Sequence, residues 1–408
     1  MKVIVITQPH DVEDEKNLII AALEAGACRV HIRKPSWSRQ QYLDLVGSIP
    51  QEFWGRITLH DHFDLCAEFV DVGLQANGRN PQLPPLFEGV TSCSCHSIEE
   101  LKGAQKFDYV TLSPIYDSIS KGGYLAAFSR TEITAAKREG LISGRVVAMG
   151  GITPDLIPEL HDMGFGGVAL LGYVWQDETV EGVSRRVQKA VKMARMSETF
   201  SLQYITHRNE KLNDIEGAQA AIDGGCRWVQ LRMKGFSDDE FVCNGHTLRE
   251  VCHKAGATFL LNDRVELVGE CGADGVHIGK GDMTPIEARA ILGEGAIIGG
   301  TANSCDDIDY LVAQGVDYIG LGPFRFTTTK EKLSPTLGLD GYTRVVEHCR
   351  QRGYRTPIVA IGGITTADIA PIMERGVDGI ALSGTILNAE DSVATTSDIV
   401  KILFKVKI

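Results

Sequence analysis

Short apolar runs alternate along the chain with segments in which hydrophobic residues recur at helical spacing. In the first half, the segments 15–25, 39–46, 131–139 and 154–163 have the pattern of amphipathic helices, and glycine follows several of them. Continuous apolar strands between such helices indicate a parallel sheet covered by helices. Eight strand and helix units in about 200 residues predict a closed (β/α)8 barrel, with an open doubly wound sheet as the second choice. The expected strands are 3–7, 28–33, 56–61, 70–75, 89–93, 109–113, 146–150 and 167–171.

The second half of the chain repeats the pattern of the first. Its expected strands are 202–206, 226–232, 258–263, 274–278, 296–300, 318–321, 358–362 and 379–383. The offset between matching segments drifts only from 199 to 212 residues, which is too long for a solenoid repeat, so each copy should be a complete domain. The matching segments are VHIR at 30–33 and VQLR at 229–232, LHD at 59–61 and LND at 261–263, and VAMGGIT at 147–153 and VAIGGIT at 359–365.

The boundary between the copies lies near residue 196, which gives domains 1–196 and 197–408. Residues 187–198 have the pattern of the last helix of the first barrel, running into a short connector. The connector is not rich in Gly, Ser or Pro, so we expect no long flexible linker between the two barrels. The sequence thus predicts two tandem TIM-type barrels that arose by internal duplication.

Composition and charge narrow the class of protein. The 408 residues are 43% hydrophobic and 23% charged, which suits a soluble globular protein with buried cores. A net charge of -12 argues against nucleic acid or an anionic membrane as partner and leaves room for a local basic pocket that binds phosphorylated small molecules. With no signal peptide or spanning segment expected, we place the protein in the cytoplasm, and a homo-oligomer is compatible with the sequence. The ten Cys, including Cys93 and Cys95 on one strand face, are expected to be reduced.

Two loops suggest a phosphate or diphosphate clamp. GPFRFTTTK at 322–330 follows an apolar strand and carries three hydroxyls and a lysine, and LSPIYDSISK at 112–121 repeats that arrangement in the first half. Flexible loops with short hydroxyl donors and a mobile positive charge suit an oxyanion. A solvated turn that caps a helix is the alternative interpretation.

The carboxyl ends of the expected strands carry further polar residues in the second half, and this edge is where (β/α)8 barrels place their chemistry. Asp263 and Asp282 could hold Mg²⁺, which prefers one or two carboxylates plus substrate phosphate oxygens. The alternatives are salt bridges at the barrel rim, helix caps and, for the glycines, simple tight turns. The polar strand ends are Gln230, Arg232 and Lys234; Asn262 and Asp263; Lys280 and Asp282; Thr301 and Asn303; Thr327, Thr329 and Lys330; Gly362 and Gly363; and Ser383 and Gly384.

Six motifs of the second half, in order, resemble thiamine phosphate synthase over residues 201 to about 390: QLRMK, NDR, DGVHIGKGD, GPFRFTTTK, AIGGIT and ALSGTI. The resemblance implies Mg²⁺-dependent condensation of hydroxymethylpyrimidine diphosphate with thiazole phosphate, and release of diphosphate. It also implies a role for each matching residue. Gln230, Arg232, Lys234 and Asn262 would hold the diphosphate, Asp263 and Asp282 would bind Mg²⁺, Lys330 would neutralise the leaving group, Thr327 and Thr329 would contact the thiazole partner, Gly363, Ser383 and Gly384 would close the phosphate pocket, and Thr301 would lie near the pyrimidine.

The first half departs from these motifs at several positions. His31 replaces Gln230, Pro35 replaces Lys234, His60 replaces Asn262, and Asn80 replaces Asp282. Part of the diphosphate and metal site is therefore missing. The residues that remain should suffice for a single phosphate: Arg33, Lys34, Asp61, Ser118, Ser120, Lys121, Gly150 and Gly151.

SCHSIEEL at 94–101 resembles the related thiazole tautomerase, which shifts a proton in a carboxythiazole phosphate. The resemblance implies that His96 carries the proton, a role that imidazole can fill near neutral pH. Alternatively, His96 lies at the start of a helix that begins near Ser97. Three hypotheses for the first barrel follow: a tautomerase, which we favour, a second synthase with an altered site, or a non-catalytic scaffold or phosphate-ligand binding module.

Two other classes of protein for the whole chain would make different demands on the site. A binding or regulatory protein for a phosphorylated ligand would not need the acidic pair Asp263 and Asp282 together with Lys330. An isomerase or epimerase of sugar phosphates would need an acid and a base that face each other in the second barrel, and the sequence offers no such pair. We therefore expect a transferase.

Overall fold

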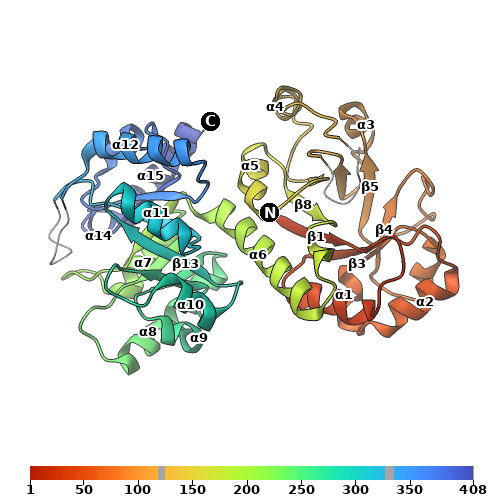
Figure 1. Cartoon of the computed structure of the whole chain (residues 1–408), viewed down its shortest axis with the longest axis horizontal. Coiled ribbons are helices and arrows are strands. Elements are labelled where there is room, and N and C mark those ends of the chain that lie inside the picture. Colours follow the sequence, from red (N-terminus) through yellow and green to blue (C-terminus); the bar gives the residue numbers. More distant parts are fainter. Residues whose placement is uncertain (118–124, 327–334, 408) are drawn as a thin grey trace. The chain divides into compact units, whose positions relative to one another are not determined.

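The computed structural model describes residues 1–117, 125–326 and 335–407. The chain divides into two compact units, Met1–Glu198 and Thr199–Ile408, so the division falls two residues beyond the expected boundary. In each unit, parallel strands close into a barrel in sequential order, β1 to β8 in the first and β9 to β16 in the second, with helices outside the strands (Figure 1). The prediction of two tandem (β/α)8 barrels is confirmed.

The first barrel follows the predicted alternation. Its strands are β1 (Lys2–Ile6), β2 (Arg29–Ile32), β3 (Ile57–Leu59), β4 (Gly73–Ala76), β5 (Thr91–Cys95), β6 (Tyr109–Leu112), β7 (Val146–Met149) and β8 (Gly167–Leu170). Its helices are α1 (Glu15–Glu24), α2 (Arg39–Ser48), η1 (Gln51–Arg56), η2 (Phe63–Ala67), α3 (Ile98–Gly103), α4 (Arg130–Arg138), η3 (Pro154–Leu156), α5 (Ile157–Asp162), η4 (Val174–Gln176) and α6 (Val180–Thr199).

The second barrel repeats this order. Its strands are β9 (Leu202–Ile205), β10 (Trp228–Leu231), β11 (Thr258–Asn262), β12 (Gly275–Ile278), β13 (Ile297–Ala302), β14 (Tyr318–Leu321), β15 (Ile358–Ile361) and β16 (Gly379–Leu382). Its helices are α7 (Asp214–Asp223), α8 (Asp238–Lys254), η5 (Val265–Leu267), α9 (Val268–Cys271), α10 (Pro285–Leu292), α11 (Cys305–Ala313), α12 (Gly338–Arg352), η6 (Thr366–Asp368), α13 (Ile369–Met373), α14 (Gly384–Leu387) and α15 (Ser392–Lys407).

Capping residues set where many of these helices begin. Ser237 accepts a hydrogen bond from the backbone N–H of Glu240, whose side chain accepts in return from the Ser237 N–H, and this capping box starts α8. Asn213 and Thr284 start α7 and α10 in the same way. Each cap stabilises its helix by about 1 kcal/mol.

Two strands of the first barrel begin later than the hydrophobic pattern predicts. The strand expected over 70–75 starts at Gly73, because Val70 lies in a turn with 62% of its surface exposed. The strand expected over 89–93 spans Thr91–Cys95. The helix expected over 187–198 is α6, which continues to Thr199 and ends shortly before β9 begins, so the connector is very short.

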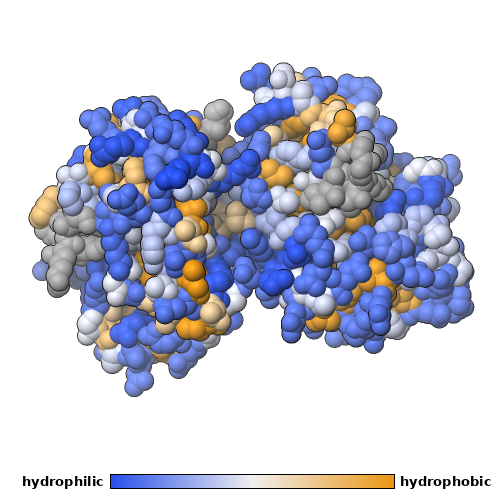
Figure 2. Space-filling model, in the orientation of Figure 1, coloured by the Kyte–Doolittle hydropathy of each residue, from blue (hydrophilic) through white to orange (hydrophobic). Residues whose placement is uncertain are grey.

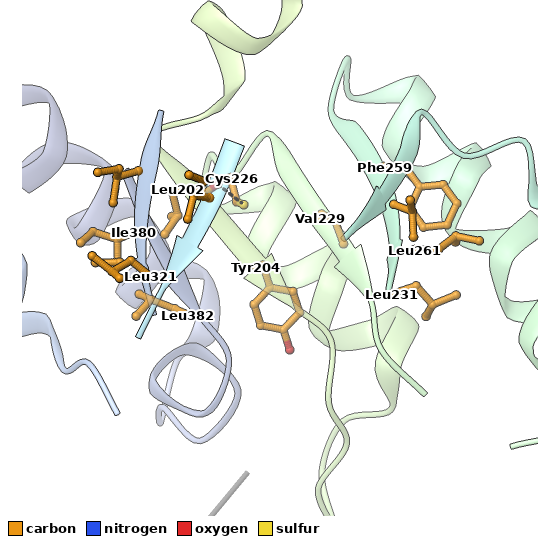
Figure 3. Packing of buried hydrophobic residues seen from close by; sticks show 14 of the residues in the cluster. Leu202, Tyr204, Cys226, Val229, Leu231, Phe259, Leu261, Leu321, Ile380 and Leu382 are labelled. Carbon is orange, nitrogen blue, oxygen red and sulfur yellow. Dashed lines mark hydrogen bonds between the residues drawn. The ribbon is translucent and has the colours of Figure 1, made fainter. Parts of the chain in front are cut away.

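Side chains alternate between the two faces of each strand, and this alternation separates the core from the barrel interior. In the second barrel, Leu202, Val229 and Ile380 belong to the apolar cluster between the strands and the helices (Figure 3). Residues one position away, such as Gln230, face the barrel interior instead. Hydrophobic residues that alternate with polar ones therefore build the core and the site at the same time.

Aromatic rings fill the lower part of the second barrel. Phe200 and Trp228 are stacked with ring centroids 3.7 Å apart, and Tyr318 packs edge-on against both. These rings occupy the amino-terminal end of the barrel.

The surface in Figure 2 is mainly hydrophilic, with hydrophobic side chains in small groups. None of the helices in the described part of the chain has both the length and the apolar character that crossing a bilayer requires. The cysteines are free thiols, and Cys93 and Cys95 face the same side of β5 with their sulfur atoms 3.9 Å apart.

Candidate active site

A cavity of about 540 Å³ opens at the carboxyl ends of the strands in the second barrel. Each described residue that the sequence nominated for synthase chemistry lines it. Those residues are Gln230, Arg232, Lys234, Asn262, Asp263, Asp282, Thr301, Gly363, Ser383 and Gly384. Thr327, Thr329 and Lys330 lie outside the described residues, so their roles stay predictions.

One edge of the cavity carries amide and cationic groups from β10 and β11. Gln230 is 1% exposed, and within the described structure its Nε2 makes no hydrogen bond although it lies beside the Tyr318 side chain. Arg232 and Lys234 follow on the same side of the chain and also face the cavity. A buried amide donor with no partner is costly, so this edge is built for a ligand that accepts hydrogen bonds.

Two carboxylates meet beside this edge. Asp282 Oδ2 accepts a hydrogen bond of 3.0 Å from the Gly279 N–H, and both Asp282 and Asp263 lie so close to Gly279 that a Cβ there would come within 2.6 Å and 3.7 Å of their oxygens. Asp263 has a left-handed backbone, with φ of 65°, which non-glycine residues adopt rarely. Burial, with the neighbouring charge of Asp282, raises the pKa of Asp263 to about 6. A positive charge beside Asp263 and Asp282 would relieve the repulsion between the two carboxylates.

Glycines shape the opposite corner of the cavity, at the ends of β15 and β16. Gly363 has φ of 67°, and a Cβ there would lie 2.6 Å from Arg325 Cγ and 2.9 Å from the Phe326 carbonyl oxygen. Gly384 begins α14, and the buried Ser383 Oγ beside it has no hydrogen-bond partner in the described structure. Close-approach backbone and an unpaired hydroxyl at this corner suit a phosphate group.

His277 and Ile205 are among the cavity-wall residues that were not singled out in the sequence. His277, on β12, lies between Tyr318 and Thr301, with its Nδ1 2.9 Å from Tyr318 Oη and its Nε2 2.9 Å from Thr301 Oγ1. Ile205, at the end of β9, adds an apolar surface. The period-two pattern already placed His277 on the interior face, which is the signal that could have found it.

Lys280 supports the rim interpretation at one strand end. It lines the cavity, but its Nζ forms an ion pair of 2.7 Å with Asp307. Asp307 also caps α11 by accepting hydrogen bonds from the N–H groups of Asn303 and Ser304.

The first barrel has its own cavity at the same end, of about 330 Å³. His96 lines it, one residue beyond β5. Two oxygen atoms of Ser113 lie near His96 Nδ1, the carbonyl oxygen at 3.2 Å and the hydroxyl oxygen at 3.3 Å. In the tautomer that carries its proton on Nδ1, the ring donates to the carbonyl. The Nε2 atom is then left as a base.

Asp61, the first barrel's counterpart of Asp263, has a cationic partner instead of an acidic one. Arg79 donates to Asp61 through Nε at 3.1 Å and Nη2 at 3.0 Å, and Asn80 donates to the same carboxylate at 2.8 Å. Tyr42 donates a further hydrogen bond of 3.1 Å. Asp61 is thus saturated by protein donors.

The expectation that Lys34 helps to bind a phosphate is wrong. Its side chain is fully buried and forms an ion pair of 2.7 Å with Glu15, and it lies over the ring of Trp37. Lys34 directly follows Arg33, so its side chain leaves the opposite face of the chain and enters the helix layer. Ser118, Ser120 and Lys121 lie outside the described residues.

Two histidines form part of the wall where the second barrel has amides. His31 Nδ1 lies 2.9 Å from His60 Nε2, and His31 Nε2 lies 2.6 Å from Tyr109 Oη. Burial, together with the charge of Arg33, lowers the pKa of His60 to about 3, and burial lowers the pKa of His31 well below its usual value. Both rings are therefore neutral near pH 7.

The strand ends gather cations, amides and a glycine-lined corner around one cavity. This arrangement defines a class of protein, the phosphate-handling (β/α)8 enzymes. The family model described as Thiamine monophosphate synthase matches residues 3–174 and again residues 202–386. The chain belongs to this family, with one copy in each barrel. It is a transferase of thiamine biosynthesis that acts on phosphorylated small molecules.

Individual relatives are similar to about half of the chain. Thiamine-phosphate synthase of Phocaeicola vulgatus is 52% identical over 204 residues, which cover 50% of this chain and 98% of the relative. The enzyme of the same name from Bacillus velezensis is 36% identical over 203 residues, with 49% and 88% covered. Among solved structures, thiamine phosphate pyrophosphorylase from Bacteroides thetaiotaomicron is 35% identical, with a TM-score of 0.44 over 48% of this chain and 98% of that one.

Proposed function

We propose that the second barrel condenses hydroxymethylpyrimidine diphosphate with thiazole phosphate in a Mg²⁺-dependent reaction that forms thiamine phosphate and releases diphosphate. One observation carries the proposal: a pair of facing carboxylates, Asp263 and Asp282, lies in the same cavity as the amide and cationic edge of Gln230, Arg232 and Lys234. That combination suits a metal-bound diphosphate better than either half would alone.

The acidic pair fits Mg²⁺. The raised pKa of Asp263 reflects burial and the repulsion of Asp282, which a divalent cation would relieve. In the described residues, no third His, Cys, Asp or Glu joins the pair, so substrate oxygens and water would complete the ion's shell. When bound, Mg²⁺ would neutralise negative charge on the diphosphate.

The protein's own groups stabilise the departing charge and position the nucleophile. The bond between the pyrimidine methylene carbon and the diphosphate oxygen breaks, and the thiazole nitrogen forms the new bond to that carbon. Arg232, Lys234 and the unpaired Gln230 Nε2 are the donors nearest the leaving diphosphate, joined by Asn262. Gly363, Gly384 and Ser383 Oγ hold the thiazole phosphate at the other corner, with Thr301 near the pyrimidine and Lys330 assigned to the leaving group.

Lys234→Gln in the full chain tests this assignment. We expect condensation with thiazole phosphate to fall at least about 100-fold, because the leaving diphosphate loses a charged donor. Lys254→Gln, an exposed lysine at the end of α8, is the matched control and should leave the rate unchanged. Normal turnover by Lys234→Gln would overturn the placement of the diphosphate.

For the first barrel we propose a thiazole phosphate tautomerase. Its support is the position of His96, which lines a small cavity with Nδ1 3.2 Å from the Ser113 carbonyl oxygen and 3.3 Å from the Ser113 hydroxyl oxygen. In the tautomer that donates from Nδ1 to this carbonyl, Nε2 is the base that takes a proton from a carbon acid. The cavity lacks the acidic pair, because Asp61 is already bound by Arg79, which argues against a second synthase site.

His96→Gln is the test, with His161→Gln on α5 as the matched control in the same barrel. The account expects His96→Gln to slow conversion of the tautomeric carboxythiazole phosphate and to spare condensation of the aromatic thiazole phosphate. If both substrates are used as before, the first barrel is a scaffold or a phosphate-ligand binding module.

A further inference from the structure

We propose that Arg33 and Arg79 form a metal-independent carboxylate subsite in the first barrel's cavity, across its mouth from a glycine-lined phosphate corner. The cavity would thereby select a thiazole phosphate that still carries a carboxylate over one that has lost it. The proposal deepens the tautomerase function and rests on it for the identity of the ligand.

The partner of the equivalent aspartate has opposite charge in the two barrels. In the second barrel, Asp263 faces another carboxylate, Asp282, and the pair calls for a cation. In the first barrel, Asp61 occupies the place of Asp263, and Arg79 neutralises it through two hydrogen bonds. Arg33, the counterpart of Arg232, then leaves one positive charge in excess. The first cavity can therefore attract an anion without a metal ion.

Arg33 is available to a ligand. Its guanidinium is half-buried on the cavity wall and makes no hydrogen bond or ion pair with the described residues; only its backbone N–H is engaged, by Thr7 Oγ1. Arg33 and Arg79 both line this cavity, and burial together with the neighbouring charge of Arg79 lowers the pKa of Arg33. An anion between them would remove this repulsion and satisfy the N–H groups of Arg33.

The anion at this place is small. The amide edge that would receive a diphosphate in the second barrel is absent, since His31 and His60 stand in place of Gln230 and Asn262 and are bonded to each other. Neutral rings that satisfy one another offer little to a diphosphate. A planar carboxylate matches the fork of a guanidinium and needs no further donors.

A second anion-binding corner lies on the other side of the barrel. Gly150 and Gly151, after β7, have φ of 100° and 67°, and a Cβ on Gly151 would lie 2.2 Å from the Asp117 carbonyl oxygen. Gly172 follows β8, and all three glycines line the cavity. Because the barrel closes in the order β1 to β8, this corner stands opposite the ends of β2 and β4, where Arg33 and Arg79 lie. The ligand that fits has an anionic group at each end.

Binding to the full-length chain in EDTA tests the subsite. Isothermal titration would compare two probes, aromatic carboxythiazole phosphate and thiazole phosphate without the carboxylate, in the wild type and in Arg33→Gln. Because the Arg33 side chain has no hydrogen-bond or ion-pair partner among the described residues, Arg33→Gln should fold normally, which its thermal unfolding checks. Arg39→Gln, an exposed arginine paired with Asp64 and Glu68, is the charge-matched control.

We expect Arg33→Gln to weaken the carboxylated probe about tenfold or more and to leave the other probe unchanged, with Arg33→Lys in between. Unchanged affinity for the carboxylated probe would overturn the subsite, as would equal weakening of both probes. The tautomerase function fails separately: if wild type binds the carboxylated probe through Arg33 but does not convert the tautomer, the subsite stands and the function falls. If conversion occurs and Arg33→Gln binds the carboxylated probe normally, the tautomerase function stands and the subsite falls.

Discussion

The acidic pair of the second barrel should destabilise the protein when no cation is bound. The pKa of Asp263 is raised from 3.8 to about 6, so the unfolded chain releases this proton at a lower pH than the folded chain does. Stability is therefore complete below about pH 4, falls as pH rises through 6, and stays lower above it. Asp263→Asn removes that loss and keeps an amide that can donate to Asp282.

The size of the effect follows from the shift. About two pKa units correspond to roughly 3 kcal/mol at most, and solvent at the mouth of a half-buried site reduces this to about 1–2 kcal/mol. We expect Asp263→Asn without Mg²⁺ to raise the unfolding temperature of its barrel by about 3–6 °C at pH 7.5. Near pH 4 the difference should vanish.

Calorimetry of the full chain at the two pH values, with Mg²⁺ and with EDTA, measures this. Mg²⁺ should stabilise the wild type and have little effect on the variant. Asp61→Asn is the matched control with the opposite sign, because it removes the charge that pairs with Arg79 and replaces one of the two acceptor oxygens by a donor, which should destabilise the first barrel. If Asp263→Asn lowers the unfolding temperature at pH 7.5, the reasoning about the pair is refuted.

Three further variants test other parts of the structure. Gly363→Ala places a Cβ 2.6 Å from Arg325 Cγ at φ of 67°, so the KM for thiazole phosphate should rise and stability should fall by about 1–3 kcal/mol; an unchanged KM would count against the phosphate corner. Lys34→Met leaves Glu15 buried without its partner, and urea unfolding should show a loss of about 3–5 kcal/mol with condensation intact. Trp228→Ala removes the ring stacked on Phe200 and should cost about 3–5 kcal/mol, whereas a cost below 1 kcal/mol would mean that the barrel floor repacks.

The hydrophobic pattern predicted the fold because hydrophobic residues recur at different periods in strands and in helices, and each period reflects a different packing environment. Runs such as 358–362 are apolar on both faces, as strands inside a ring of helices can be. The same logic predicted the cavity, since parallel strands in a closed barrel bring all their carboxyl ends together. Asp263 and Gly363 line this one cavity although they are far apart in the sequence.

The sequence could not show which residues bind one another, or which face of the chain an individual side chain leaves. Arg33 and Lys34 are adjacent and equally basic, yet one lines the cavity and the other is buried against Glu15. Asp61 is expected from the sequence to belong to a phosphate site, but in the structure Arg79, in the loop after β4, binds it. The period-two pattern places His277 on the interior face of its strand, but the sequence does not show that its ring bonds to Tyr318 and Thr301.

The central claim is that condensation takes place in the second barrel's cavity around the acidic pair. The most direct measurement is the rate of thiamine phosphate formation by the full chain from pyrimidine diphosphate, aromatic thiazole phosphate and Mg²⁺, for Asp282→Asn and for His96→Gln. The account predicts a loss of at least about 100-fold for Asp282→Asn and an unchanged rate for His96→Gln. An unchanged rate for Asp282→Asn, or a comparable loss for His96→Gln, would contradict it.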